Sequence, residues 1–109
     1  MIGFPHLRRA LLAVALGLPG PAALAQQQDC ALTVRTHGFL SRAQARCGFT
    51  RYAPSMQESA RACTRRLSNV SGQEYLRAGS EDFDRNERER GRERLCAELL
   101  ESFPDMVGR

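Results

Sequence analysis

The chain has 109 residues, enough for one domain, and a formal net charge of +4. Arg8 and Arg9 lie in a segment with the pattern of a signal peptide, and the other 14 arginines face 12 acidic residues, which leaves a net charge near +2. This near balance argues against a dedicated nucleic-acid-binding domain, which usually carries a concentrated basic face, so we expect no nucleic-acid partner.

Residues 1–25 carry the three parts of a secretory signal peptide. Arg8-Arg9 forms a positive n-region, residues 10–18 form a short apolar h-region, and residues 23–25 (Ala-Leu-Ala) match the small-residue cleavage site. The apolar run is about half of the ~20 residues that span a bilayer, so we expect no stable membrane span in the mature chain. We expect cleavage before Gln26 and export through the inner membrane, to the periplasm or beyond, leaving one small helical domain over residues 26–109.

The expected mature domain has few large apolar residues. Residues 26–109 contain seven Leu, three Val, four Phe and no Ile or Trp. A chain of this size is marginally stable without additional support. An even number of cysteines in a short exported chain predicts that this support comes from two disulfides. The four cysteines are Cys30, Cys47, Cys63 and Cys96. They form neither a C-x-x-C redox motif nor the closely spaced pairs of a zinc site.

The first predicted helix covers residues 30–47. Cys30, Val34 and His37 recur on one helical face, which continues to Cys47, although the first residues also alternate as a strand would. Gly38 is a candidate kink and Gly48 a candidate end of this helix. Residues 49–54 are expected to form a loop.

Two capping boxes predict the starts of two further helices. Ser55 with Glu58, and Ser71 with Glu74, have the spacing at which the two side chains satisfy the free backbone N–H groups of a helix start. Residues 68–70 are expected to form the turn between these helices. The overall prediction is therefore an all-α, disulfide-stapled bundle of about three helices.

The third predicted helix is long, with Tyr75, Leu76 and Phe83 facing inward and a candidate break near Gly79 or Gly91. Residues 84–94 contain no apolar side chain, and acidic and basic residues recur there at helical spacing. The expected intrahelical pairs are Glu81–Arg85, Asp84–Arg88, Glu87–Arg90 and Glu89–Arg92. We favour a solvated stretch that bridges two packed ends, and a partner-binding arm over residues 81–94 is the alternative.

The apolar pattern returns at the C-terminal end of this helix, from Leu95 to Phe103. We expect this end to pack against the rest of the domain. Pro104 should close the helix, and residues 105–109 should form a tail.

Helix length bears on which cysteines are bonded. A continuous helix over residues 30–47 separates Cys30 from Cys47 by about 25 Å at 1.5 Å per residue. A disulfide needs Cα atoms within about 7 Å, so these two cysteines cannot pair unless the helix folds back. An up-down-up arrangement brings Cys47 near Cys96, and we therefore favour the pairs Cys47–Cys96 and Cys30–Cys63.

The residues offer little catalytic chemistry, and we expect no catalytic, cofactor-binding or metal-binding site. His37 is the single histidine of residues 26–109 and has no carboxylate near it in sequence. We expect it on a helix surface or in a turn, and a small enzyme or metal carrier built around it is the alternative.

One segment combines aromatic residues with arginines, the residue types enriched at binding hot spots. Most of its aromatics should belong to the core, and a partner surface is the alternative. The candidate surface residues are Phe39, Arg42, Arg46, Phe49, Arg51 and Tyr52.

The expected function is therefore a non-enzymatic one. An exported protein of this kind would act by protein–protein contact with an unidentified partner in the cell envelope, as an accessory, inhibitor, immunity or chaperone-like factor. Arginine-mediated binding of an anionic envelope lipid or polymer is the alternative from another class, and it would weaken steeply with salt.

Reduction of the cysteines should abolish cooperative folding. Each disulfide typically contributes about 2–4 kcal/mol, and total domain stability is about 5–15 kcal/mol. We expect the oxidised protein to melt cooperatively by circular dichroism, and the reduced protein to be unfolded or rapidly proteolysed. An unchanged cooperative melt after reduction would contradict the dependence on disulfides.

Overall fold

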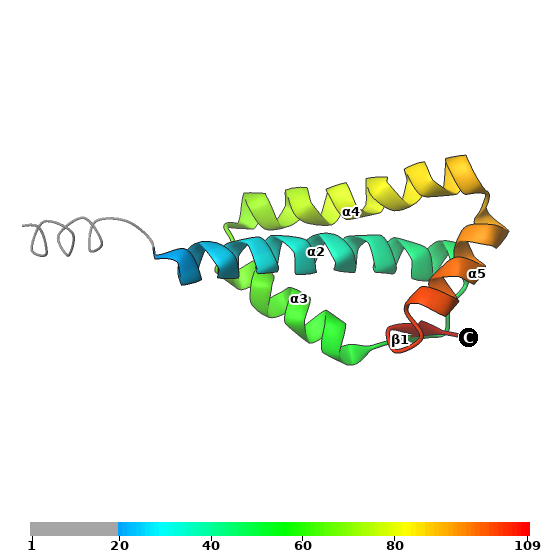
Figure 1. Ribbon diagram of the computed structural model, residues 1–109, viewed down its shortest axis with the longest axis horizontal. Coiled ribbons are helices and arrows are strands. Elements are labelled where there is room, and N and C mark those ends of the chain that lie inside the picture. The colour runs from blue at the N-terminus through cyan, green and yellow to red at the C-terminus, as the bar shows by residue number, and fades with distance from the viewer. Residues whose placement is uncertain (1–19) are drawn as a thin grey trace, which may run out of the picture.

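The computed structural model describes residues 20–109, and the predicted n-region and h-region of the signal peptide lie outside the described residues. The described part contains four helices and one two-stranded sheet (Figure 1). In chain order these are α2 (Pro21–Cys47), β1 (Arg51–Tyr52), α3 (Pro54–Arg66), α4 (Asn69–Arg90), α5 (Arg92–Ser102) and β2 (Val107–Gly108). The predicted all-α, disulfide-stapled class is confirmed. The long third helix of the prediction is two helices, α4 and α5.

Helix α2 is the central element and lies between α4 and α3 (Figure 1). It ends where predicted, because Gly48 takes a left-handed conformation with φ of 70° and its N–H donates to the carbonyl of Gln44. It begins at Pro21 rather than near Cys30, and it continues through Gly38. Residues 26–29, ahead of the predicted start, are also helical, because a helix that has already formed extends at little cost into good helix formers such as Gln. The expected cleavage point before Gln26 falls within α2.

Two glycines bring the backbones of α2 and α4 into direct contact. A Cβ atom on Gly79 of α4 would lie 2.0 Å from the carbonyl oxygen of Arg35 and 2.7 Å from the nitrogen of Phe39. A Cβ on Gly38 of α2 would lie 2.2 Å from the carbonyl oxygen of Leu76. Only glycine fits at such a close approach. Gly38 and Gly79, considered as a kink and a break, instead serve helix–helix packing.

The main core lies where α2, α4, α5 and the small sheet meet. Phe83 of α4 is fully buried there, and its ring meets that of Phe39 edge to face with centroids 5.6 Å apart. Leu95 and Leu99 of α5 are buried in the same cluster, as expected for the returning apolar pattern. Tyr75 was expected to face inward, but 36% of its surface is exposed, and it borders an open hollow beside Gln28 and Ala31 of α2.

Two disulfides attach the outer helices to α2. Cys30 bonds to Cys63 of α3 with a Cα–Cα distance of 4.8 Å, and Cys47 bonds to Cys96 of α5 at 5.6 Å. These are the two pairs that the helix-length argument favours. Each bond joins segments at least 33 residues apart in sequence, so together they restrict most of the unfolded chain.

The two predicted capping boxes do not form. Helix α3 begins at Pro54, a residue suited to the first helical position, and no side chain caps it. Helix α4 begins at Asn69, and the capping residue is Ser68, whose Oγ accepts a 3.1 Å hydrogen bond from the N–H of Ser71. Residues 68–70 are therefore the start of the helix and not a turn. Ser71 lies inside a helix that the earlier serine already caps.

The predicted loop and tail pair with each other. β1 and β2 form an antiparallel ladder in which Tyr52 lies opposite Val107 and Arg51 lies opposite Gly108. The Arg51 guanidinium also donates to the carbonyl oxygens of Pro104 and Val107 at 2.6 and 3.0 Å. Two-residue strands have no periodicity to detect, so sequence patterns could not reveal this contact.

Substitution of Gly79 by alanine should destabilise the protein. The new methyl group would overlap the backbone of α2, and we expect a loss of about 1–3 kcal/mol, as for other overpacked sites. Urea denaturation measures this free energy of unfolding.

Gly72→Ala is the matched control in the same helix. Its Cβ would meet only the methyl Cγ2 of Thr64, at 3.0 Å. Alanine improves helix propensity by about 1 kcal/mol, so this variant should stay within about 1 kcal/mol of the parent. Equal stability of the Gly79 and Gly72 variants would show that the backbone contact is not a constraint.

Candidate functional site

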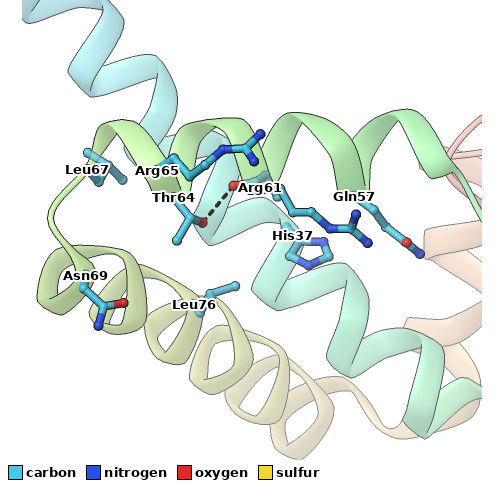
Figure 2. Close-up of a pocket in the computed structure, with 9 residues that line it drawn as sticks. His37, Gln57, Arg61, Thr64, Arg65, Leu67, Asn69 and Leu76 are labelled. Carbon is cyan, nitrogen blue, oxygen red and sulfur yellow. Dashed lines mark hydrogen bonds between the residues drawn. The ribbon is translucent and has the colours of Figure 1, made fainter.

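A groove separates α3 from α4 on the surface of α2. Figure 2 shows the two helices diverging from the turn that joins them, with His37 of α2 between them. The hollow has a volume of about 630 Å³, within the size range of small-molecule and side-chain binding sites. We call it the α3–α4 groove, and its lining residues are His37, Gln57, Ala60, Arg61, Thr64, Arg65, Leu67, Asn69 and Leu76.

Both walls of this groove are anchored to α2. The Cys30–Cys63 disulfide holds α3, and the contact of Leu76 with Gly38 holds α4. At the narrow end, Thr64 packs its methyl group toward Gly72 while its hydroxyl donates to the carbonyl of Ala60 at 2.7 Å. The groove is therefore preformed by covalent and backbone contacts.

His37 lies at the base of the groove, half-buried, rather than on an open helix surface or in a turn. A 2.7 Å hydrogen bond joins its Nδ1 to the hydroxyl of Tyr52, and Ser41 lies at 3.4 Å. Burial lowers the pKa of His37, and burial raises the pKa of Tyr52, so both side chains favour their neutral forms. His37 thus contributes a neutral hydrogen-bonding group at the base. Its partners are hydroxyls, whereas a general base is usually oriented by a carboxylate.

The charged stretch of α4 forms three salt bridges to α2 and one within the helix, between Asp82 and Arg85. Salt bridges join Arg35 to Asp82 at 2.7 Å, Arg42 to Asp84 at 2.9 Å, and Arg46 to Glu87 at 2.8 Å. The four expected intrahelical pairs are absent from the ion pairs of residues 20–109. Because Phe83 points into the core, its acidic neighbours flank the contact with α2 and meet the arginines there. Asp82, Asp84 and Glu87 are therefore held against α2, while residues 88–94 are exposed between the buried Phe83 and Leu95, as expected for a solvated stretch that bridges two packed ends.

The salt bridges between α2 and α4 lower the pKa values of the carboxylates that form them. A hydrogen bond from Arg35 lowers the pKa of Asp82, and one from Arg46 lowers the pKa of Glu87. Both carboxylates thus stay ionised at neutral pH, although exposed pairs of this kind each contribute only about 0–1 kcal/mol to stability.

The six candidate surface residues do not gather in one exposed patch. Phe49 and Tyr52 are buried in the core, and Phe39 packs against Phe83. The three arginines are engaged within the chain: Arg42 and Arg46 bind carboxylates of α4, and Arg51 binds backbone carbonyls. The aromatic residues of this segment therefore belong to the core, as favoured from the sequence, rather than to an exposed partner surface.

The arginines of α3 are different. Arg61 and Arg65 line the groove and are exposed, and neither they nor Arg66 form an ion pair among residues 20–109. The sequence analysis did not single them out. The available signal was that three arginines on this helix face only one acidic residue, Glu58.

A second hollow of about 390 Å³ lies among α2, α4 and α5. Its apolar lining includes Phe39, Leu99 and the exposed Leu32, but the arginines at its edge are neutralised. Arg35 is paired with Asp82, and Arg90 with Glu98. The α3–α4 groove combines an apolar lining with two arginines, Arg61 and Arg65, that form no ion pair among residues 20–109. A third hollow of about 530 Å³, beside Leu67 and Tyr75, holds one such arginine, Arg66.

Two general features complete the description of residues 20–109. No helix in this part is both long and apolar enough to cross a bilayer. No cluster of three or more His, Cys, Asp or Glu side chains is arranged to hold a metal ion within the same part. The chain matches no protein-family model, no curated protein and no solved structure.

Acidification should destabilise the fold through His37. Its folded-state pKa lies below the ordinary value of 6.5, so the unfolded chain takes up the proton first as pH falls. Stability is fully present above about pH 6.5 and declines as the pH drops from there to the folded pKa. We expect the melting temperature to fall between about pH 7.5 and about pH 5.

His37→Gln is the matched variant, because glutamine can still bond Tyr52 but does not titrate. Its melting temperature should fall less over the same pH interval. The ion-paired carboxylates Asp82 and Glu87 titrate below their ordinary values of 3.8 and 4.5, outside this interval. An identical pH dependence in the two proteins would rule out His37 as its source.

Proposed function

We propose that this chain is an exported, non-enzymatic protein that acts by contact with another protein in the cell envelope, in an accessory, inhibitory, immunity or chaperone-like role. The observation that carries the proposal is the α3–α4 groove, which pairs an apolar lining with two arginines that no carboxylate of residues 20–109 neutralises. A preformed concave site with a few convergent polar groups is the usual form of a binding site.

The distribution of arginines supports this choice of surface. On α2, Arg35, Arg42 and Arg46 are bound to carboxylates of α4 and contribute to the fold. On α3, Arg61 and Arg65 make no such contact and remain available. Charged groups that do not serve folding and border an apolar hollow are suited to recognise a partner of opposite charge.

The two disulfides support export, as does the signal-peptide pattern of residues 1–25. Two disulfides suggest an oxidising environment, since such bonds persist outside the cytoplasm and are rare within it. A small core that depends on these bonds makes the same compartment a condition for folding. Residues 1–25 have the pattern that would direct the chain there.

Binding of an anionic lipid or polymer is a second candidate. Arg66 is exposed beside Arg65, so α3 carries three arginines within six residues. This cluster could meet a phosphate-rich surface. The groove favours a protein partner, because a flat anionic surface would contact the arginines without filling the apolar hollow.

Site-specific photo-crosslinking tests the proposed function. A photo-crosslinking amino acid replaces Gln57, which lines the groove, and in a matched variant it replaces Gln73, which is exposed on α4 and is not among the residues that line the groove. In the envelope of the source organism we expect a discrete crosslinked protein from position 57 and none from position 73. Crosslinks to lipid alone, or equal products from both positions, would contradict a protein partner at this groove.

The same preparation tests export. Mass spectrometry of the protein from the periplasmic fraction should give a chain that begins at Gln26 and contains both disulfides. A chain that retains residues 1–25 and stays with the cytoplasmic fraction would contradict the proposed location.

A further inference from the structure

We infer that the α3–α4 groove receives an acidic amphipathic helix of the partner protein, with two carboxylates one turn apart that bind Arg61 and Arg65. This inference rests on the proposed function and names the chemistry of the partner. It follows from the spacing of the charges, the shape of the groove and the nature of its lining.

The two arginines form a charge pair with a defined spacing. Arg61 and Arg65 are four residues apart on α3, which places them on the same helix face about 6 Å apart along the axis. Glu or Asp residues three or four positions apart on a second helix have the same spacing. A guanidinium and a carboxylate can form two parallel hydrogen bonds. Two such pairs would strengthen binding and would also fix the position of the bound helix along α3.

The shape of the groove suits a helix. Its two walls are helices, its base is a helix, and the walls open progressively from the turn near Leu67 and Asn69 toward Gln57 (Figure 2). An added helix placed there could pack against α3 and α4 at the usual 8–10 Å interaxial distance. The added helix would lie between α3 and α4 over α2, and the four helices would then form a bundle.

The lining explains why the helix should be amphipathic. The half-buried Leu67 and Leu76 present apolar surface within the groove, while Arg61 and Arg65 lie at the α3 edge. An occupying helix must therefore bury an apolar face and direct its acidic residues to one side. This is the helix-in-groove mode of recognition, with anchors at positions i, i+3 or i+4.

Charge complementarity also excludes a basic helix as the occupant of the groove. A basic helix would place like charges beside two exposed arginines that have no carboxylate partner among residues 20–109. Unfavourable juxtaposition of this kind is how interfaces reject wrong partners. His37 adds no net charge at the base, since burial keeps its imidazole neutral.

Three synthetic peptides test the inference against the full disulfide-bonded protein. Each is about 18 residues long, sufficient for a stable helix, with one shared Leu/Ala face and a fluorescent label. The polar positions at i and i+4 carry Glu in the first peptide, Gln in the second and Lys in the third. By fluorescence anisotropy we expect the Glu peptide to bind most tightly, the Gln peptide more weakly, and the Lys peptide not measurably.

Charge reversal locates the site. The double variant Arg61→Glu/Arg65→Glu should bind the Glu peptide at least about tenfold more weakly, because two attractive contacts become repulsive. The matched control Arg77→Glu/Arg88→Glu changes the net charge equally but alters α4 away from the groove, and it should bind as the parent does. Arg61→Gln/Arg65→Gln should give an intermediate affinity, and all variants should retain the parent melting temperature.

Three outcomes would overturn the inference. The Lys peptide could bind as tightly as the Glu peptide, the control variant could lose as much affinity as the groove variant, or vesicles of anionic phospholipid could bind through Arg61 and Arg65 when the Glu peptide does not. The crosslinking experiment at Gln57 is independent of these peptides. A protein crosslink there without binding of the Glu peptide would retain the proposed function and reject the acidic helix.

Discussion

The contact between the backbones of α2 and α4 is the constraint on which the rest of the structure depends. Gly38 and Gly79 allow the helices to approach until a single methyl group would collide with the main chain. This approach fixes the rotation of α4 about its own axis. Phe83 is thereby directed into the core, and the acidic residues on either side of it meet the arginines of α2. The same contact holds α4 in place as one wall of the groove.

Once α4 is fixed, the arginines divide into two groups with different roles. Those on α2 are neutralised along the α2–α4 contact, where they support a thin core with salt bridges of modest energy. Those on α3 form no ion pair with any carboxylate of the described residues 20–109, because α3 diverges from α4 and its disulfide at Cys63 attaches it to α2. The groove and its charge are therefore consequences of one geometry, in which α3 and α4 touch α2 but separate from each other.

Much of the framework could be predicted from local signals. The helix end at Gly48, the helix break at Gly91 and the packing of Leu95 and Leu99 each depend on residues close together in sequence. The start of α4 was misplaced because both Ser68 and Ser71 are suited to capping, and Ser68 is the one used. The start of α3 was misplaced because Pro54 occupies the first helical position and no side chain caps that helix. For residues 39–52 the favoured core assignment describes the aromatics, and the alternative of an exposed partner surface does not. Aromatic and arginine side chains suit a core with ion pairs as well as they suit an interface, and composition does not distinguish these environments.

The sequence by itself determined the helical class, the need for disulfides, and the pairing that helix length permits, because these follow from periodicity, core size and the fixed rise of a helix. Tertiary structure alone decided which glycines pack, which arginines are neutralised, and that residues 51–52 pair with residues 107–108. It also decided that a groove exists beside His37. Each of these depends on the rotation and separation of helices far apart in the chain, and no local pattern encodes that geometry.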